Sequence, residues 1–320
     1  MSLIDRARNA VNTVRTGVEN AAHKVENAVE TTVHKAENVA VQTGQKIQNV
    51  VDGFETKAVN GAKAVEGFFG GGNQADKVYD GQFVGAGGKT YPPGTSLADV
   101  PGVTPKNNPN PSETILYVNG INTTKDGQSS SLQSIADTTG AKVVGIHNST
   151  EGMGADLAQC VKDKLDKGTN PAVDTMADTL YKELKAGHTV HIMAHSQGGL
   201  ITSRALDHLY NRLRVEDGMS QGDAQKLMGK LQVETFGAAA AHYPDGPQYV
   251  HYVNKSDLVP DAFGLGPTKW NPLTDGGKGS VVHRFNDPHL NPIASHGFES
   301  VYLQHRVPFD QARANQFGDK

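Results

Sequence analysis

Residues 190–200 read VHIMAHSQGGL, and this stretch determines the expected fold class. A short apolar run leads into a His-Ser-Gln triplet and two glycines, after which apolar residues recur at helical spacing. That order predicts a strand that turns sharply into a helix, with Ser196 at the turn. The residues beside so tight a turn must be small, and Ala194, Gly198 and Gly199 meet that requirement.

The serine at this turn has two interpretations. In a nucleophile elbow, whose usual pattern is G-x-S-x-G, the turn raises a serine out of the sheet so that its hydroxyl can attack a substrate. Ala194 stands here in place of the first glycine, which is a mild steric change. The alternative is an ordinary strand-to-helix turn in which Ser196 caps the helix. The residues downstream have to distinguish the two.

The composition limits the class of protein. A chain of 320 residues has room for one large α/β domain and an appended region. The 30 Lys and Arg residues against 34 Asp and Glu residues give a slightly acidic balance, which argues against nucleic-acid binding. The single cysteine, Cys160, cannot form an internal disulfide. No Cys and His cluster has metal-ligand spacing, so we expect no metal and no cofactor; Asp287 and Asn291 could hold a cation, but their spacing does not require one.

Nothing in the sequence predicts insertion into a membrane. The first residues lack the apolar core of a secretory signal, and no window is long and apolar enough to span a bilayer. We therefore expect synthesis in the cytoplasm and, where export occurs, a route that needs no signal peptide. Peripheral membrane association stays open.

Residues 1–69 carry an eleven-residue repeat. The segment HKVEN at 23–27 recurs as HKAEN at 34–38, and residues 3–69 contain no proline. Eleven residues make almost three helical turns, so the apolar positions form a nearly straight stripe along one long amphipathic helix. The stripe has three alternative interpretations. It can pack on a lipid surface, or on a second helix of this chain or of another chain such as a secretion partner. The third alternative is that the segment alone is unfolded.

The rest of the chain divides into two regions. Residues 70–111 are rich in Gly, Pro and Asn and are expected to form a linker, with a short hairpin around 78–84. From 112 to 320, strand and helix patterns alternate, which predicts a mostly parallel sheet flanked by helices. The expected strands are 114–118, 142–146, 189–193, 231–236, 248–253 and 281–285. The expected helices are 129–138, 154–165, 173–186, 198–213, 220–228 and 292–304.

Downstream of Ser196, an aspartate follows a later strand. The run YVHYV at 249–253 leads into NKSDLVP, which places Asp257 just past the strand end. A carboxylate there can be held by turn amides and can face an imidazole; the alternative is a turn aspartate of the kind common before proline. In hydrolases with a nucleophile elbow, an acid and then a histidine follow the serine along the chain. Asp257 fits the acid in that order.

Several later histidines compete for the place of the general base. His283 lies inside a predicted strand, which favours a structural role, and His305 falls past the last predicted helix. A base must lie on a loop at the carboxyl edge of the sheet with its ring free to reach the serine. His296, within SHGF, fits this requirement best, and His289 is the second choice. His195, next to the serine, is expected to be a packing residue with a hydrogen bond.

An acyl-transfer site also needs two amide donors for the developing oxyanion. One is expected from the backbone N–H of Gln197, at the start of the predicted helix. The second is expected from the loop VNGINTT at 118–124, which follows the first strand of the α/β region. Gly120 allows a close backbone approach, so Ile121 is the favoured donor and Asn122 the second choice. The alternative is that Asn-Gly forms only a turn.

Three segments together resemble a known family. AHSQG at 194–198, NKSDLVP at 254–260 and SHGF at 295–298 resemble bacterial α/β-hydrolase lipases, and the D-x-V-P element is similar to that of the class 3 lipase group. The resemblance covers roughly 114–303 and extends to the lipase effectors that type VI secretion systems deliver. It implies an α/β-hydrolase fold and hydrolysis of acylglycerols or phospholipids. Ala194 and the repeated N-terminal segment depart from the family pattern.

The sequence therefore predicts a serine hydrolase that cleaves lipid carboxyl esters through an acyl-enzyme, with Ser196, Asp257 and His296 as catalytic residues. The expected substrate is a lipid or phospholipid of a membrane, on which the N-terminal helix docks, as for a secreted antibacterial effector. Two alternatives stay open. One is an esterase or thioesterase for soluble esters with an oligomerising helix, and the other is a helical interaction protein whose hydrolase-like domain is inactive.

Overall fold

The computed structural model describes residues 74–121, 123–149, 170–266, 274–289 and 294–318. The repeated segment 1–69 and the expected helix 154–165 lie outside these residues. Within the described ranges, no helix is both long enough and apolar enough to cross a bilayer.

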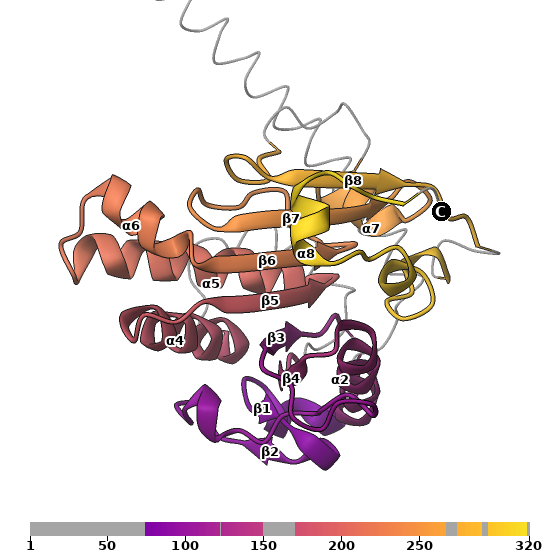
Figure 1. The fold of residues 1–320 in the computed structure, drawn as a ribbon, viewed down its shortest axis with the longest axis horizontal. Helices are drawn as coiled ribbons and strands as arrows, with labels where there is room; N and C mark the ends of the chain where they lie inside the picture. Colours follow the sequence, from indigo (N-terminus) through magenta and orange to yellow (C-terminus); the bar gives the residue numbers. More distant parts are fainter. Residues whose placement is uncertain (1–73, 122, 150–169, 267–273, 290–293, 319–320) are drawn as a thin grey trace, which may run out of the picture. The chain divides into compact units, whose positions relative to one another are not determined.

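An eight-stranded sheet forms the centre of the described chain, with the strand order β2-β1-β4-β3-β5-β6-β7-β8 (Figure 1). From β4 to β8 in this order all neighbours are parallel, while β1 is antiparallel to both β2 and β4. The strands are β1 (Phe83–Val84), β2 (Thr90–Tyr91), β3 (Thr114–Val118), β4 (Lys142–Ile146), β5 (Val190–His195), β6 (Leu231–Phe236), β7 (Gln248–Asn254) and β8 (Val281–Phe285). The expected α/β class with a mostly parallel sheet is confirmed, and β3 to β8 match the six expected strands to within two residues at each end.

Helices cover both faces of the sheet. The helices are α2 (Lys125–Thr139), α4 (Pro171–Lys185), α5 (Gln197–Val215), α6 (Gln221–Met228), α7 (Leu258–Phe263) and α8 (Phe309–Arg313). Apolar residues of α4, α5 and α6 share one buried cluster with strand residues such as Leu116 and Ile192. Those of α2 and the C-terminal stretch 298–312 share a second cluster with Tyr117 and Met193. Because side chains alternate across a strand, both faces of the sheet are buried, as is usual for parallel sheets.

Sequence signals mark the ends of the flanking helices. Thr124 Oγ1 accepts from the Gly127 N–H at the start of α2, and Gly140 ends the helix in the left-handed conformation. Asn170 caps α4 with its side chain, and Pro171 occupies the first turn. With Thr124 as its cap, α2 starts about one turn earlier than the apolar periodicity predicts.

The prediction that residues 70–111 form a linker is wrong for the part that the structure describes. β1 pairs with β4 and β2 pairs with β1, so the hairpin runs from 83 to 91 instead of around 78–84. Phe83 and Val84 are fully buried. The glycines and prolines of this stretch therefore join short elements of the α/β domain, and the sheet begins earlier in the chain than expected.

The prediction of one long helix over 292–304 is also wrong. The described part of this stretch forms two short 3-10 helices, η4 (Ala294–His296) and η5 (Tyr302–Gln304). Its buried residues are Ser295, His296, Phe298, Val301, Tyr302 and Leu303. A regular helix on the surface of a domain buries one stripe, whereas the short elements of this segment bury the pair 295–296 and the run 301–303, which favours an irregular path packed into the domain.

The strand order changes direction at β3. The chain passes from β3 through α2 to β4 on one side, and then through α4 to β5 on the other side of β3. In open α/β sheets, ligands bind at the carboxyl ends of the strands where the order reverses in this way. The reversal places the loop that starts at Asn119 beside the turn that starts at Ser196.

Candidate active site

Ser196 occupies a strained backbone turn at the end of β5. Its φ of 57° and ψ of −122° lie outside the ordinary regions for a residue with a side chain. Among the described non-glycine residues, only Asn315 also has a positive φ. The Ser196 N–H donates to the Phe236 carbonyl at 3.0 Å, and the Ser196 carbonyl accepts from the Ala239 N–H at 2.9 Å. The Ser196 side chain makes no cap hydrogen bond to α5, which argues against an ordinary helix cap.

The two glycines after the serine are required by close packing. A side chain at Gly198 would overlap the carbonyl oxygen of Val118 at the end of β3. A side chain at Gly199 would overlap that of Ala238, which follows β6. The start of α5 therefore lies in direct contact with the ends of both neighbouring strands, and the expected need for small residues is confirmed at these two positions.

Asp257 and His296 form a buried hydrogen-bonded pair. Asp257 follows β7 and caps α7, where its Oδ1 accepts from the Val259 N–H at 2.9 Å. Its Oδ2 lies 2.6 Å from His296 Nδ1, although the two residues are 39 positions apart in the chain. Because an ionised carboxylate only accepts, Nδ1 carries the proton and Nε2 is the basic nitrogen of the neutral ring.

His289, the second choice for the base, belongs to a different network. Its Nε2 lies 3.3 Å from Asp287 Oδ1, and Asp287 Oδ2 lies 3.0 Å from His305 Nε2. The structure thus brings Asp257 to His296 and ties His289 to another carboxylate. This arrangement favours His296 as the partner of the serine.

His195 supports His296 from the side of β5. The two imidazole rings lie with their centroids 4.6 Å apart, and His195 Nε2 lies 3.0 Å from the His296 carbonyl oxygen. Burial, together with the neighbouring His296, lowers the pKa of His195 well below its usual value, so the ring is neutral. The expected role of a packing residue with a hydrogen bond is confirmed. Because His195 directly precedes Ser196, this contact holds His296 beside the serine turn.

The loop after β3 lies against Ser196. A β-carbon built on Gly120 would stand 2.8 Å from Ser196 Cβ and 3.4 Å from Ser196 Oγ. Gln197 is the first residue of α5, where backbone amides point out of the helix end. Ile121 is buried next to Gly120, and Asn122, the second choice of donor, lies outside the described residues. The two segments expected to supply oxyanion donors therefore meet at the serine.

A buried amide network joins these two segments, and sequence reasoning missed it. Asn119 Nδ2 donates to the carbonyl oxygens of Gly120 at 2.8 Å and Asn148 at 2.9 Å, and Asn119 Oδ1 accepts from the Asn148 N–H at 2.9 Å. Asn148 Nδ2 donates to Gln197 Oε1 at 2.8 Å. The network fixes the loop after β3 relative to the first residue of α5. The available signal was that Asn119 and Asn148 each follow a predicted strand at the same edge of the sheet.

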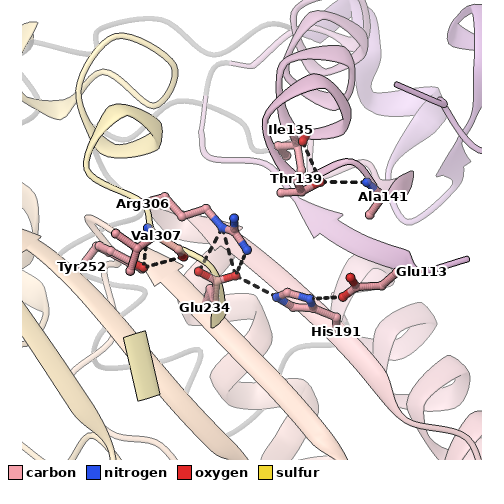
Figure 2. Close-up of polar contacts among 9 residues, drawn as sticks. All are labelled: Glu113, Ile135, Thr139, Ala141, His191, Glu234, Tyr252, Arg306 and Val307. Carbon is pink, nitrogen blue, oxygen red and sulfur yellow. Dashed lines mark hydrogen bonds and ion pairs between the residues drawn. The ribbon is translucent and has the colours of Figure 1, made fainter. Parts of the chain in front are cut away.

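Buried charges anchor the C-terminal segment that carries His296 (Figure 2). Arg306 donates to Glu234 on β6, from Nη2 to Oε1 at 2.8 Å and from Nε to Oε2 at 3.1 Å. Glu234 Oε1 also lies 2.8 Å from His191 Nε2, and His191 Nδ1 lies 2.5 Å from Glu113 Oε1. Burial lowers the pKa of His191, but the hydrogen bonds to Glu113 and Glu234 outweigh it and raise the pKa to about 9. The four side chains therefore alternate in charge, and no sequence pattern pointed to them.

Possible metal ligands and surface cavities in the described part of the chain do not point to a second site. In the described ranges, no group of three or more His, Cys, Asp or Glu side chains could hold a metal ion. Asp287, a candidate cation ligand from the sequence, contacts two histidines, and Asn291 lies outside the described residues. Two open surface cavities of about 510 and 560 Å³ lie beside α2 and between α4 and α5, and none of the candidate catalytic residues lines them. The turn at Ser196 is therefore the better candidate site.

Comparison of the sequence with protein-family models and with curated proteins finds no match. Function is therefore inferred from the residues and from their geometry. Two observations support an active site here: the strained turn at Ser196, and the hydrogen bond between Asp257 and His296.

Proposed function

We propose that this protein is a serine hydrolase of the α/β-hydrolase type. The observation that carries the proposal is the strained turn at Ser196, on the same sheet edge as the hydrogen-bonded Asp257–His296 pair. An ordinary helix start needs no positive φ, whereas a nucleophile elbow is strained because its serine must project from the sheet. The order Ser, Asp, His along the chain is that of α/β-hydrolases.

In the proposed reaction, His296 Nε2 takes the proton of Ser196 Oγ as Oγ attacks the carbonyl carbon of the ester. Asp257 fixes the tautomer of the imidazole and stabilises the imidazolium. The backbone N–H groups of Gln197 and Ile121 bind the tetrahedral oxyanion. The bond to the alcohol oxygen then breaks, and the imidazolium gives its proton to that oxygen. Water, activated by the same histidine, hydrolyses the acyl-serine and restores the free enzyme.

The proposed substrate is the carboxyl ester of a membrane lipid, either an acylglycerol or a phospholipid. Support comes from the lipase-like motifs and from segment 1–69, whose regular lysines and apolar stripe suit a lipid interface. Ser196 is only 2% exposed, so a substrate reaches it after the groups that cover it are displaced. Such a step can accompany docking on a surface. Delivery as an antibacterial effector is the biological setting that the resemblance favours.

Hydrolysis of soluble esters is the second candidate function. Most residues of the apolar stripe in 1–69 are Ala and Val, which bury little area each, so a single contact with lipid is weak. A stripe of this kind also suits an oligomeric helix packing, in which case the substrate need not be a lipid. The two candidates share the same catalytic residues.

Hydrolysis of two substrates tests the proposal. We expect the full chain to release fatty acid from phospholipid vesicles and to cleave a short p-nitrophenyl ester, and Ser196→Ala to do neither. Ser203→Ala is a matched control, because Ser203 is a buried serine of α5 whose hydroxyl donates to the His242 carbonyl at 2.6 Å. Turnover of the soluble ester alone would favour the second candidate. Turnover of neither substrate by the wild type would contradict both.

A further inference from the structure

Tyr302 makes a short hydrogen bond to the candidate acid. It begins η5, on the same C-terminal segment as His296, and is fully buried. Its Oη lies 2.5 Å from Asp257 Oδ2, and the Asn254 N–H lies 3.3 Å from the same hydroxyl oxygen. Because an ionised carboxylate only accepts and an amide N–H only donates, Tyr302 donates to Asp257 and accepts from Asn254.

The two oxygens of Asp257 have unequal partners. Oδ1 accepts one hydrogen bond, from the Val259 N–H at 2.9 Å. Oδ2 accepts two, from His296 Nδ1 at 2.6 Å and from Tyr302 Oη at 2.5 Å. The histidine and the tyrosine therefore share one acceptor oxygen. Each hydrogen bond withdraws negative charge from that oxygen and so weakens the other.

We propose that Tyr302 is a positioning residue that fixes the Asp257 carboxylate and limits how strongly it stabilises the protonated form of His296. The proposal rests on the proposed function, in which His296 acts as the base. A second donor on Oδ2 compensates part of the negative charge, so the imidazolium beside it is stabilised less. As a result, His296 stays neutral, and able to accept the serine proton, down to a lower pH than it would without the tyrosine.

The tyrosine remains a donor throughout the working pH range. Burial, followed by the charge of Asp257, raises the pKa of Tyr302 well above its usual value. On its other side, the ring of Tyr302 packs edge-on against Phe285, with centroids 5.5 Å apart. Phe285 stacks in turn on His305, whose Nε2 pairs with Asp287. The His305–Asp287 contact therefore lies on the far side of the Phe285 ring from Tyr302.

The titratable groups that pack on His296 in the described part of the chain are few. Asp257 and Tyr302 face it from the loop after β7 and from η5, and His195 faces it from β5. His195 is neutral because burial lowers its pKa well below the usual value. Of these contacts, the hydroxyl of Tyr302 on Asp257 Oδ2 is the one that a single-atom substitution removes.

Tyr302→Phe removes the hydroxyl and keeps the ring. Its matched control is Tyr252→Phe, because Tyr252 is also buried and its hydroxyl contacts the backbone of Val307 on the same C-terminal segment. For Tyr302→Phe we expect the midpoint of the acidic limb of kcat/KM on a soluble ester to rise by about 0.5 to 1 pH unit. For Tyr252→Phe we expect the wild-type midpoint. A purely structural role would give both variants the same profile.

A second variant moves the midpoint in the opposite direction without deleting a group. Site-specific 3-fluorotyrosine at position 302 has a more acidic phenol and therefore donates a stronger hydrogen bond to Asp257. We expect it to lower the midpoint of the acidic limb below that of the wild type. Because this residue is nearly isosteric with tyrosine, it keeps the test decisive if Tyr302→Phe folds poorly.

An NMR titration of the His296 ring in histidine-labelled protein gives a readout that does not depend on turnover. We expect its midpoint to rise in Tyr302→Phe and to fall with 3-fluorotyrosine. An unchanged or oppositely ordered midpoint would overturn the role of Tyr302, whether or not the enzyme is active. A wild-type chain that hydrolyses no ester and takes up no fluorophosphonate would instead contradict the proposed function, while the NMR titration would still decide the role of Tyr302.

Discussion

Gly120 and Ser196 approach so closely that a β-carbon on Gly120 would stand 2.8 Å from the β-carbon of Ser196 and 3.2 Å from His195 Nδ1. The backbone of the loop after β3 therefore lies directly beside the serine. In the proposed mechanism this contact places the Ile121 N–H where the oxyanion develops. Glycine is therefore required at position 120, because the loop after β3 packs directly against the turn at Ser196.

Gly120→Ala is expected to lower kcat for ester hydrolysis by about 100-fold or more, because the added methyl group displaces the serine or the donor loop. Steady-state kinetics on a soluble ester measure this effect. The control is Gly222→Ala in α6, where a β-carbon would meet nothing within 4 Å. Alanine at that helical position should stabilise the fold by about 0.5–1 kcal/mol and leave kcat unchanged. Wild-type kcat in Gly120→Ala would contradict this arrangement of the loop.

Substitutions of the acid and the base should distinguish His296 from His289. We expect Asp257→Asn to lower kcat by about 10⁴-fold, as in other triads, and His296→Ala to have an effect of similar size. His289→Ala should keep most of the activity, because His289 pairs with Asp287 instead. A variant series in which His289→Ala is inactive and His296→Ala is active would show that the assigned base is wrong.

Arg306→Met is expected to destabilise the protein strongly, because it leaves Glu234 buried without its bidentate partner. Removal of one member of a buried ion pair typically costs about 3–5 kcal/mol. Urea unfolding measures the loss. Lys106→Met is the control, since its ion pair with Asp137 is at the surface and should contribute little to the free energy of unfolding. Equal effects of the two substitutions would argue against an anchoring role for the buried network.

The same network predicts how stability depends on pH. Flanking carboxylates raise the pKa of His191 to about 9 in the folded protein, above the value of about 6.5 for an unfolded chain. A raised folded-state pKa stabilises the protein fully below about pH 6.5, and the contribution is lost as the pH rises through about 9. The free energy of unfolding should therefore fall between these two pH values in the wild type. His191→Gln should show a flatter dependence there, and an equal slope in both proteins would contradict the assignment.

The sequence predicts the parallel sheet and the order of the candidate catalytic groups because both depend on local patterns. Apolar runs locate β3 to β8 to within two residues at each end, and small residues mark the turn at Ser196. Asp257 and His296 follow from the rule that such groups lie on loops at the carboxyl edge. Their mutual distance of 2.6 Å, in contrast, is set by packing of the C-terminal segment and has no signal in the sequence.

The features that sequence reasoning missed depend on contacts between distant segments. Phe83 and Val84 form a strand because β4 has an open edge to pair with, although Gly and Pro around them indicate a linker. The segment after β8 is irregular where runs of neighbouring residues, such as 301–303, are buried together, whereas its apolar spacing alone suggests a helix. Tyr302 looks like a residue of that helix in the sequence, and only the fold brings its hydroxyl to Asp257.

Deletion of residues 1–72 tests the substrate class. If the striped segment docks the enzyme on lipid, the truncated protein should lose activity on phospholipid vesicles and keep its activity on a short soluble ester. Circular dichroism checks that the truncated chain is folded. Equal loss on both substrates, or loss on neither, would contradict docking through this segment.

Labelling with a fluorophosphonate shows whether Ser196 is an activated nucleophile. Only a serine with a base and an oxyanion site reacts readily with this probe, and mass spectrometry of the digested protein locates the adduct. Because Ser196 is buried, the reaction is run with and without phospholipid vesicles. We predict one covalent adduct, on Ser196, that is absent from Ser196→Ala and strongly reduced in His296→Ala. A folded wild-type protein that remains unlabelled under both conditions, or an adduct on another residue, would show that Ser196 is not an activated nucleophile.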